Sequence, residues 1–498
     1  MGCKVSSHIP RRDLIFHRFR WVYCQLEALR HCLPPSVARI LEELPETLDE
    51  TYERVLREIN KANREHARRL LQCLTVALRP LRVEELAEVL AIDFNAPSDG
   101  GIPQLNPNWR WADQHQAVLS TCSSLIAIVD DGDSKVVQFS HFSVKEYLTS
   151  DRLACSSVDI SRYHIVLEPA HTIIAQACLG VLLRLDDHVN KDNVGNIPFA
   201  IYAAQHWVDH AGFEKVASLI RDGMEYFFDA DKPHWAAWCR VQMIDKPWET
   251  FEPVNRAEDA FPLYYASLGG FYDLVEYLVG KHPEHINARG GRSVTPLVAA
   301  LGGKHFEVAE LLHRNGADVD VRNRSGDTPL REASLAGVLY VVEWLLNHEA
   351  DVNAQGFNGC TPLQSAATNG HLQAFHMLIE HNADFHIRNA FGMTPLHAAA
   401  AGYEDHHNRI DIMQVLLDHG ADPNARDNDN STPLHHSSWW KTGKHTPQQG
   451  TVEGTRLLLK HGAIIDAEAN GGWTALQLAL EHGREDIATC LKEHGATR

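Results

Sequence analysis

The residue types that most often perform chemistry do not occur here in the spacings that such chemistry needs. A phosphate-binding loop needs a Gly-rich turn ending in Gly-Lys-Ser/Thr, because backbone N–H groups and the lysine hold the phosphates while the hydroxyl binds magnesium. Gly443-Lys444 lacks the upstream glycine, and Gly303-Lys304 is followed by histidine. The sequence also has no G-x-S-x-G nucleophile turn and no H-E-x-x-H zinc helix. We therefore expect no enzyme activity, no cofactor, no metal and no small-molecule substrate.

The N-terminus carries one motif for covalent modification. Met1-Gly2-Cys3-Lys4-Val5-Ser6 matches the M-G-x-x-x-[ST] acceptor of N-myristoylation, and the adjacent cysteine could take a palmitoyl chain. Two acyl chains anchor a protein to a membrane stably, whereas one binds only marginally. Gly2 and Cys3 are therefore candidate lipidation residues. The alternative is that a truncated or misassigned start places this short motif here by chance.

Composition narrows the class of protein. A chain of 498 residues, 44% hydrophobic and 22% charged, is expected to form two to four folded domains. The net charge of -19 argues against direct nucleic-acid binding, which needs clustered Lys and Arg. The ten cysteines form no CxxC pair, which is typical of free thiols in a reducing compartment. The longest apolar helix candidate, residues 173–185, is too short to span a bilayer, so a soluble intracellular protein is expected.

An internal repeat dominates the C-terminal half. Thr-Pro-Leu recurs at Thr295, Thr328, Thr361, Thr394 and Thr432, with variants at Phe261 and Thr474. Successive starts are 34, 33, 33, 33, 38 and 42 residues apart. Each unit ends in an apolar helix and a turn such as Gly316-Ala317-Asp318. This pattern resembles the ankyrin repeat, whose period is 33 residues and whose motif is T-P-L-H-x-A.

The chemistry of the repeat motif is structural. Threonine can cap a helix with its hydroxyl, and proline at the first helical position loses no hydrogen bond. One unit cannot bury its apolar face alone, so about seven units are expected to stack into a solenoid between residues 255 and 498. Many of the 31 histidines occupy the repeat's own slots, such as His397 and His435, and we interpret them as solvated loop residues. His406-His407 is the one adjacent pair considered for a metal, and solvated loop histidines are preferred there because a metal site needs convergent ligands at fixed spacing.

The two long intervals place insertions between the helices of the fifth and sixth units. The second insertion begins with Trp439, Trp440 and Lys441, where the repeat usually has small or polar residues. Exposed aromatic side chains are favoured anchors at protein interfaces. These three residues, with Phe357 and Phe391, are the candidate partner-binding residues. The alternative is that the insertion folds back and buries the tryptophans.

The N-terminal half shows a mixed pattern. Residues 48–62, 64–78 and 82–90 are expected to be helices, and residues 125–129 and 136–139 flank Asp130-Asp131-Gly132-Asp133 as a hairpin. Helices followed by a hairpin favour a winged helix over residues 33–152. This segment has 13 basic and 19 acidic residues, so protein contact is favoured over DNA binding.

Three segments resemble fungal NACHT–ankyrin proteins, which are similar to immune-receptor-like NTPases. They are residues 44–54 (LPETLDETYER), 79–86 (RPLRVEEL) and 141–148 (HFSVKEYL). The resemblance runs from about Phe19 to the end and includes a helical bridge around Ala203–His210. A winged helix of this kind also occurs in relatives of the GPI inositol-deacylases, a label that implies no activity here. Because the P-loop is missing, only the last NTPase helix is expected, within residues 1–32.

These observations predict a mainly α fold with four parts: an N-terminal segment (1–32), a winged-helix α+β module (33–152), a helical bridge (153–254) and an ankyrin solenoid (255–498). The preferred function is a non-catalytic scaffold that binds a protein partner, in the cytoplasm or at a membrane. One alternative is an ankyrin-type transcription coregulator in the nucleus. Another is that nucleotide-binding exons are missing and the product is a NACHT NTPase.

Overall fold

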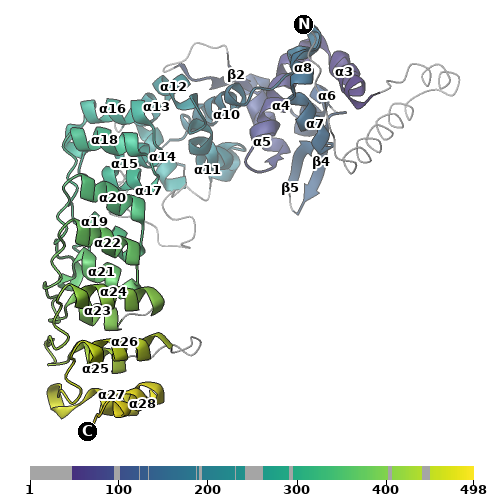
Figure 1. Cartoon of the computed structure of the whole chain (residues 1–498). Coiled ribbons are helices and arrows are strands. Elements are labelled where there is room, and N and C mark those ends of the chain that lie inside the picture. The colour runs from purple at the N-terminus through teal and green to yellow at the C-terminus, as the bar shows by residue number, and fades with distance from the viewer. Residues whose placement is uncertain are drawn as a thin grey trace, which may run out of the picture. The chain divides into compact units, whose positions relative to one another are not determined.

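A computed structural model describes residues 47–94, 101–122, 124–132, 134–186, 188–189, 193–229, 232–241, 262–290, 295–401, 406–439 and 449–497 (Figure 1). It is mainly helical, as expected, with one small sheet and one two-stranded ladder. The described residues divide into two compact units. One runs to Pro262 and includes Phe271–Leu278, and the other comprises Leu263–Gly270 and the chain from Val279 onward.

The first unit begins with the expected winged helix. Its elements are α3 (Leu48–Glu58), a 3-10 turn (Lys61–Asn63), α4 (Arg64–Val76), β1 (Leu81–Arg82), α5 (Val83–Leu90), β2 (Ile92–Asp93), β3 (Gln104–Leu105), a 3-10 turn (Pro107–Trp109), α6 (Gln114–Cys122), β4 (Ile126–Asp131) and β5 (Ser134–Phe139). Thr47 and Glu50 form a capping box that starts α3. This helix ends four residues earlier than predicted, because Asn60 caps a separate 3-10 turn.

The three-stranded sheet has the order β1-β5-β4, with antiparallel pairs. Val129 pairs with Val136 across the predicted hairpin. Strand β1 pairs through Leu81 with Val137, which places a strand from before α5 at the edge of the hairpin. This order, with α5 and α6 between β1 and β4, defines a winged helix and confirms the hairpin prediction.

A helical bridge completes the first unit. It contains α7 (Phe142–Leu148), α8 (Asp151–Ala154), α9 (Val158–Ser161), α10 (Leu167–Leu182), a 3-10 turn (Val194–Asn196), α11 (Ala200–Ala211), α12 (Val216–Leu219), α13 (Arg221–Phe227) and α14 (Pro233–Val241). Trp207 is fully buried among Phe227, Phe228 and Trp238, with ring centroids 5.6–5.8 Å away. Such edge-to-face aromatic packing adds to the stabilisation from burial alone.

Buried polar side chains join the bridge to the winged helix. The Tyr202 hydroxyl accepts the Leu78 N–H at 3.2 Å and lies 2.9 Å from Nε2 of His210. Burial lowers the pKa of His210 to about 3, so its imidazole is neutral in this environment. The winged helix and the bridge, treated separately in the sequence, are therefore one compact unit in the fold.

The repeat region folds as successive helix pairs (Figure 1). They are α15 (Pro262–Leu268) and α16 (Tyr272–Lys281), α17 (Pro296–Gly302) and α18 (Phe306–Arg314), α19 (Pro329–Ala336) and α20 (Leu339–Asn347), α21 (Pro362–Asn369) and α22 (Leu372–Glu380), α23 (Pro395–Ala401) and α24 (His406–Asp418), α25 (Pro433–Trp439) and α26 (Gln449–Lys460), and α27 (Ala475–Glu481) and α28 (Glu485–Glu493). Short 3-10 turns occur at Pro283–His285, Phe357–Gly359 and Asn470–Gly472.

The Thr-Pro-Leu motif acts as the sequence predicts. Thr295, Thr328 and Thr361 each accept a hydrogen bond from the backbone N–H three residues later, and the following proline is the first helical residue. The small side chains of Ala366 and Ala367 are fully buried where neighbouring units pack. Local sequence therefore determines where these first helices begin, and packing against neighbouring units stabilises them along their length.

Candidate protein-binding surface

The loops that join successive repeat units form a hydrogen-bonded series. Ala390 N–H donates to the Asn358 carbonyl at 2.8 Å, Asn428 N–H to the Phe391 carbonyl at 3.0 Å, and Asn470 N–H to the Asp429 carbonyl at 2.9 Å. Each loop tip is thus attached to the tip of the next unit. We call residues 356–359, 390–392, 428–430 and 470–472 the loop-tip ridge.

Two candidate residues lie on this ridge. Phe357 and Phe391 are each 54% exposed, on neighbouring tips joined by the bond between Ala390 and Asn358. Large apolar side chains are suited to a protein interface when they stay half-exposed on a backbone that hydrogen bonds fix in place. The structure therefore brings these two predicted residues onto one surface.

Buried charge holds the first of these tips in place. Asp327 Oδ1 accepts the Phe357 N–H at 2.6 Å, and Asp327 Oδ2 lies 2.8 Å from Nη1 of Arg331. Both charged side chains are at most 10% exposed, so the pair is shielded from water. On the next tip, the Asn389 side chain accepts the Phe391 N–H at 3.0 Å. Side-chain hydrogen bonds therefore fix the backbone of both tips, from which the two aromatic rings project.

A second series of bonds runs beside the ridge. Arg289, Arg322, Arg388 and Arg426 each donate from the guanidinium to the carbonyl of the equivalent residue in the next unit, and Gln355 donates to the Arg388 carbonyl at 2.9 Å. Because these side chains recur at the repeat period, they fix the spacing between units. The ridge is accordingly a preorganised surface, which lowers the entropic cost of binding.

The other candidates lie outside what the structure describes. Trp439 is the last residue of α25 and its side chain is outside the described residues, as are Trp440 and Lys441. Gly2 and Cys3 also precede the described chain. Their roles as binding and lipidation residues stay predictions.

The histidines of the Pro-Leu-His slots are buried, which corrects the expectation that they are solvated. His397 is 0% exposed and His435 is 1% exposed. Nδ1 of His397 accepts hydrogen bonds from the backbone N–H and hydroxyl of Thr394, at 3.1 and 2.8 Å. Nε2 therefore carries the proton and donates to the Ser431 carbonyl of the next unit at 3.2 Å. These side chains cap a helix and join two units at once.

The same geometry recurs one unit later, where His435 bridges Thr432 and the Trp473 carbonyl. Burial, and then the neighbouring His436, lowers the pKa of His397 to about 4. Burial also lowers the pKa of His435. Both imidazoles are thus held neutral in structural roles.

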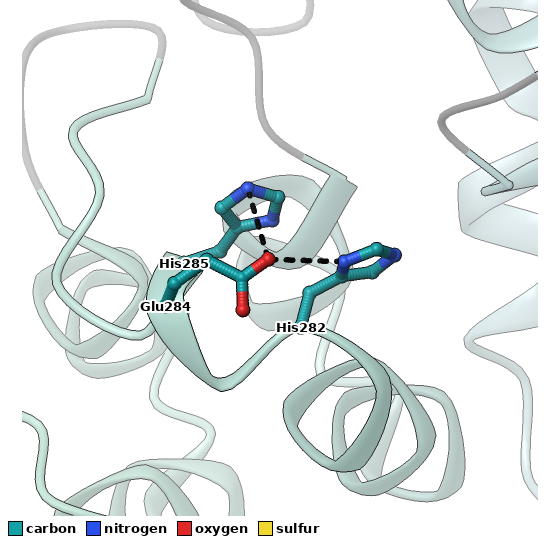
Figure 2. A group of neighbouring side chains, drawn as sticks. All are labelled: His282, Glu284 and His285. Atoms are coloured by element: carbon teal, nitrogen blue, oxygen red, sulfur yellow. Dashed lines mark hydrogen bonds and ion pairs between the residues drawn. The ribbon is translucent and has the colours of Figure 1, made fainter.

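One group of potential metal ligands was missed by the sequence reasoning. His282, Glu284 and His285 lie around the 3-10 turn after α16, and their ligand atoms are within 4.8 Å of one another (Figure 2). The available signal was a pair of histidines three residues apart on a Pro-initiated turn. His406 and His407, the pair that was considered, begin α24, and their side chains are outside the described residues.

The basic side chains of the winged helix lie outside its helix α6. Helix α6, which follows α5 in the position of a recognition helix, contains no Lys or Arg, and strand β4 ends in Asp130 and Asp131. Basic side chains of this unit instead line a cavity of about 460 Å³ at the start of α4, formed by Lys61, Arg64, Glu65, Arg68 and Arg162. The helix that reads DNA in such folds therefore lacks positive charge here.

The fold and this surface define a winged-helix module followed by ankyrin repeats. Residues 263–356, 297–389 and 363–446 each match the ankyrin repeats family, and residues 52–159 match the winged helix domain of GPI inositol-deacylase. The chain is 32% identical over 279 residues to the azaphilone pigments biosynthesis cluster protein L of Monascus ruber. That similarity covers 52% of this chain and 57% of the relative, so the chain spans little more than half of the relative's length. Within the described residues, no helix is long and apolar enough to cross a membrane.

Proposed function

We propose that this chain is a non-catalytic scaffold that binds a protein partner through the loop-tip ridge. The observation that carries the proposal is the exposure of Phe357 and Phe391 on neighbouring loop tips that are hydrogen-bonded to each other. Ankyrin repeats are a fold in which stacking supplies stability and surface residues are free to serve binding. The absence of a P-loop and of nucleophile and zinc-helix motifs in the sequence supports a role without catalysis.

The test is a comparison of partners recovered by three purified forms of the chain. Phe357→Ser/Phe391→Ser removes both rings, and Leu480→Ser serves as the control, because Leu480 is 52% exposed on α27 and away from the ridge tips. Truncating an aromatic that is a hot spot of an interface costs about 2 kcal/mol or more. Partners retained by wild type and Leu480→Ser should be lost from the double variant, with all three melting at the same temperature.

Equal recovery of every partner by a stably folded double variant would reject the ridge as the binding surface. Trp439→Ala/Trp440→Ala belongs in the same experiment, because the insertion after α25 is the other candidate surface. Loss of partners with that variant alone would move the interface to the insertion.

A second function is favoured by the match to a winged helix and by the resemblance to NACHT–ankyrin proteins. We propose as the alternative that these modules serve a nucleotide-switched protein whose NTPase part is encoded upstream. Sequencing the transcript upstream of the Met1 codon distinguishes the two. An in-frame G-x-x-x-x-G-K-[ST] motif would replace the scaffold proposal with the NTPase.

The proposed location is the cytoplasm, with membrane attachment through Gly2 and Cys3; nuclear residence as a coregulator is the alternative. Gly2→Ala should move the protein from the membrane fraction to the soluble fraction. An unchanged distribution would reject acylation.

A further inference from the structure

The turn that closes the first repeat unit places two imidazoles on one side. His282 precedes the 3-10 turn Pro283–His285, so His282 and His285 are three residues apart. A 3-10 helix has three residues per turn, and side chains at this spacing eclipse one another. The two rings accordingly lie 5.1 Å apart between centroids and within 21° of parallel.

The carboxylate of Glu284 reaches back between these rings (Figure 2). Its Oε1 lies 3.2 Å from Nδ1 of His282 and 3.8 Å from Nε2 of His285. Ligand atoms bound to one tetrahedral zinc ion at about 2.0–2.1 Å stand roughly 3.3 Å apart. The three groups therefore need only small side-chain rotations to share an ion. They are 24–62% exposed, so an ion can enter from solution.

The repeat framework does not require these residues. In the second unit the corresponding turn is Gly316-Ala317-Asp318, where Gly316 adopts a left-handed conformation with φ of 95°. The first unit has Pro283-Glu284-His285 instead.

We propose that His282, Glu284 and His285 form a binding site for a divalent transition-metal ion of the zinc class. Two imidazoles and one carboxylate suit Zn²⁺, whereas Ca²⁺ and Mg²⁺ prefer oxygen ligands throughout. Three protein ligands leave the remaining position to water.

The bound ion would act on the stacking of the first two units. The turn leads directly to Asn287, whose Oδ1 accepts the Asp318 N–H at 2.9 Å and whose Nδ2 donates to the Gly316 carbonyl at 3.3 Å. An ion that holds residues 282–285 also holds the backbone that presents this asparagine. Because the unfolded turn does not bring the ligands together, binding favours the folded state.

The test is a calorimetric titration of the full chain with Zn²⁺ after treatment with a chelator. His282→Gln/His285→Gln removes both imidazoles while keeping polar side chains of similar size, and Glu284→Gln removes only the charge. His376→Gln is the matched control, because His376 is an exposed histidine on α22. Comparing the number of Zn²⁺ ions bound by wild type with the number bound by each variant distinguishes this site from binding at other histidines, including His406 and His407.

Wild type and His376→Gln should bind one more Zn²⁺ than His282→Gln/His285→Gln. Glu284→Gln should bind that ion about tenfold more weakly or worse, since one of three ligands loses its charge. In wild type and His376→Gln, but not in His282→Gln/His285→Gln, Zn²⁺ should slow hydrogen exchange in residues 283–290. The same stoichiometry and affinity in wild type and the double variant would overturn the proposal. So would wild-type binding that appears only at millimolar Zn²⁺. Equal melting temperatures in chelator show that the variants fold.

Discussion

Replacing His397 by glutamine should remove part of the acid sensitivity of the ankyrin units. The folded-state pKa of His397 is about 4, whereas the unfolded chain has the ordinary histidine value of about 6.5. Below pH 6.5 the unfolded state therefore binds more protons than the folded state. The stability that His397 contributes is complete above pH 6.5 and is lost as the pH falls toward 4.

The size of this effect follows from the two pKa values. At pH 5 the unfolded imidazole is almost wholly protonated while the buried one is about one-tenth protonated, which corresponds to about 2 kcal/mol of lost stability relative to pH 7.5. The cause is local: a protonated Nδ1 would no longer accept from Thr394, and the charge would be buried.

Glutamine is the appropriate substitution because this chain already uses it in two other units. Gln364 accepts the Thr361 N–H and donates to carbonyls of the next unit, and Gln477 caps α27 in the same way. His397→Gln can thus keep the cap and the link to Ser431 without a titrating group. At pH 7.5 the variant and wild type should differ by no more than about 1 kcal/mol, the value of a typical hydrogen bond.

The measurement is hydrogen exchange of peptides covering α23 and α25 in the full chain, which reports local opening free energies. Between pH 7.5 and pH 5, after correction for intrinsic rates, wild type should lose about 2 kcal/mol more than His397→Gln. His435 titrates in the same direction, so His397→Gln/His435→Gln should be less acid-sensitive still. If the difference in opening free energy between wild type and His397→Gln stays constant over this pH range, the reasoning is refuted.

Two further predictions concern the turns between units. Glu349 has a left-handed conformation with φ of 65° at a position where other units have glycine, so Glu349→Gly should raise the free energy of unfolding by about 1 kcal/mol. Asn382, at φ of 63°, occupies the same position in the next unit. Asn382→Gly should stabilise the protein less, because asparagine tolerates this conformation. Urea midpoints of the ankyrin transition would show it, and a loss of stability in Glu349→Gly would contradict the strain argument. Asn353 accepts the Asp384 N–H of the next unit at 2.8 Å, and His386 occupies the equivalent position one unit later, so His386→Asn should add a hydrogen bond worth about 1 kcal/mol. Slower exchange of the Asp422 amide would confirm that bond, and unchanged exchange would exclude it.

Much of the fold could be predicted because its signals are local and repeated. The 33-residue period and the Thr-Pro-Leu caps determine the helix pairs, since each unit meets the same neighbours and needs the same residues. The hairpin of the winged helix was also predictable, because strand pattern and turn residues lie within fifteen positions of one another. In contrast, the pairing of Leu81 with Val137 joins distant segments and needed the assembled sheet.

For the candidate sites, local sequence determined the residue types and tertiary structure determined their surroundings. Phe357 and Phe391 were identifiable as aromatics in loops, but their place on one ridge follows from hydrogen bonds between units. His397 looked like a solvated loop histidine because its slot repeats; stacking of the next unit over it excludes water and turns it into a buried link. The grouping of His282 with His285 depended on backbone geometry, because a 3-10 turn eclipses residues that an extended loop would separate. Sequence alone therefore determined which chemical groups each unit carries, and the stacked structure decided which of them meet water and which meet one another.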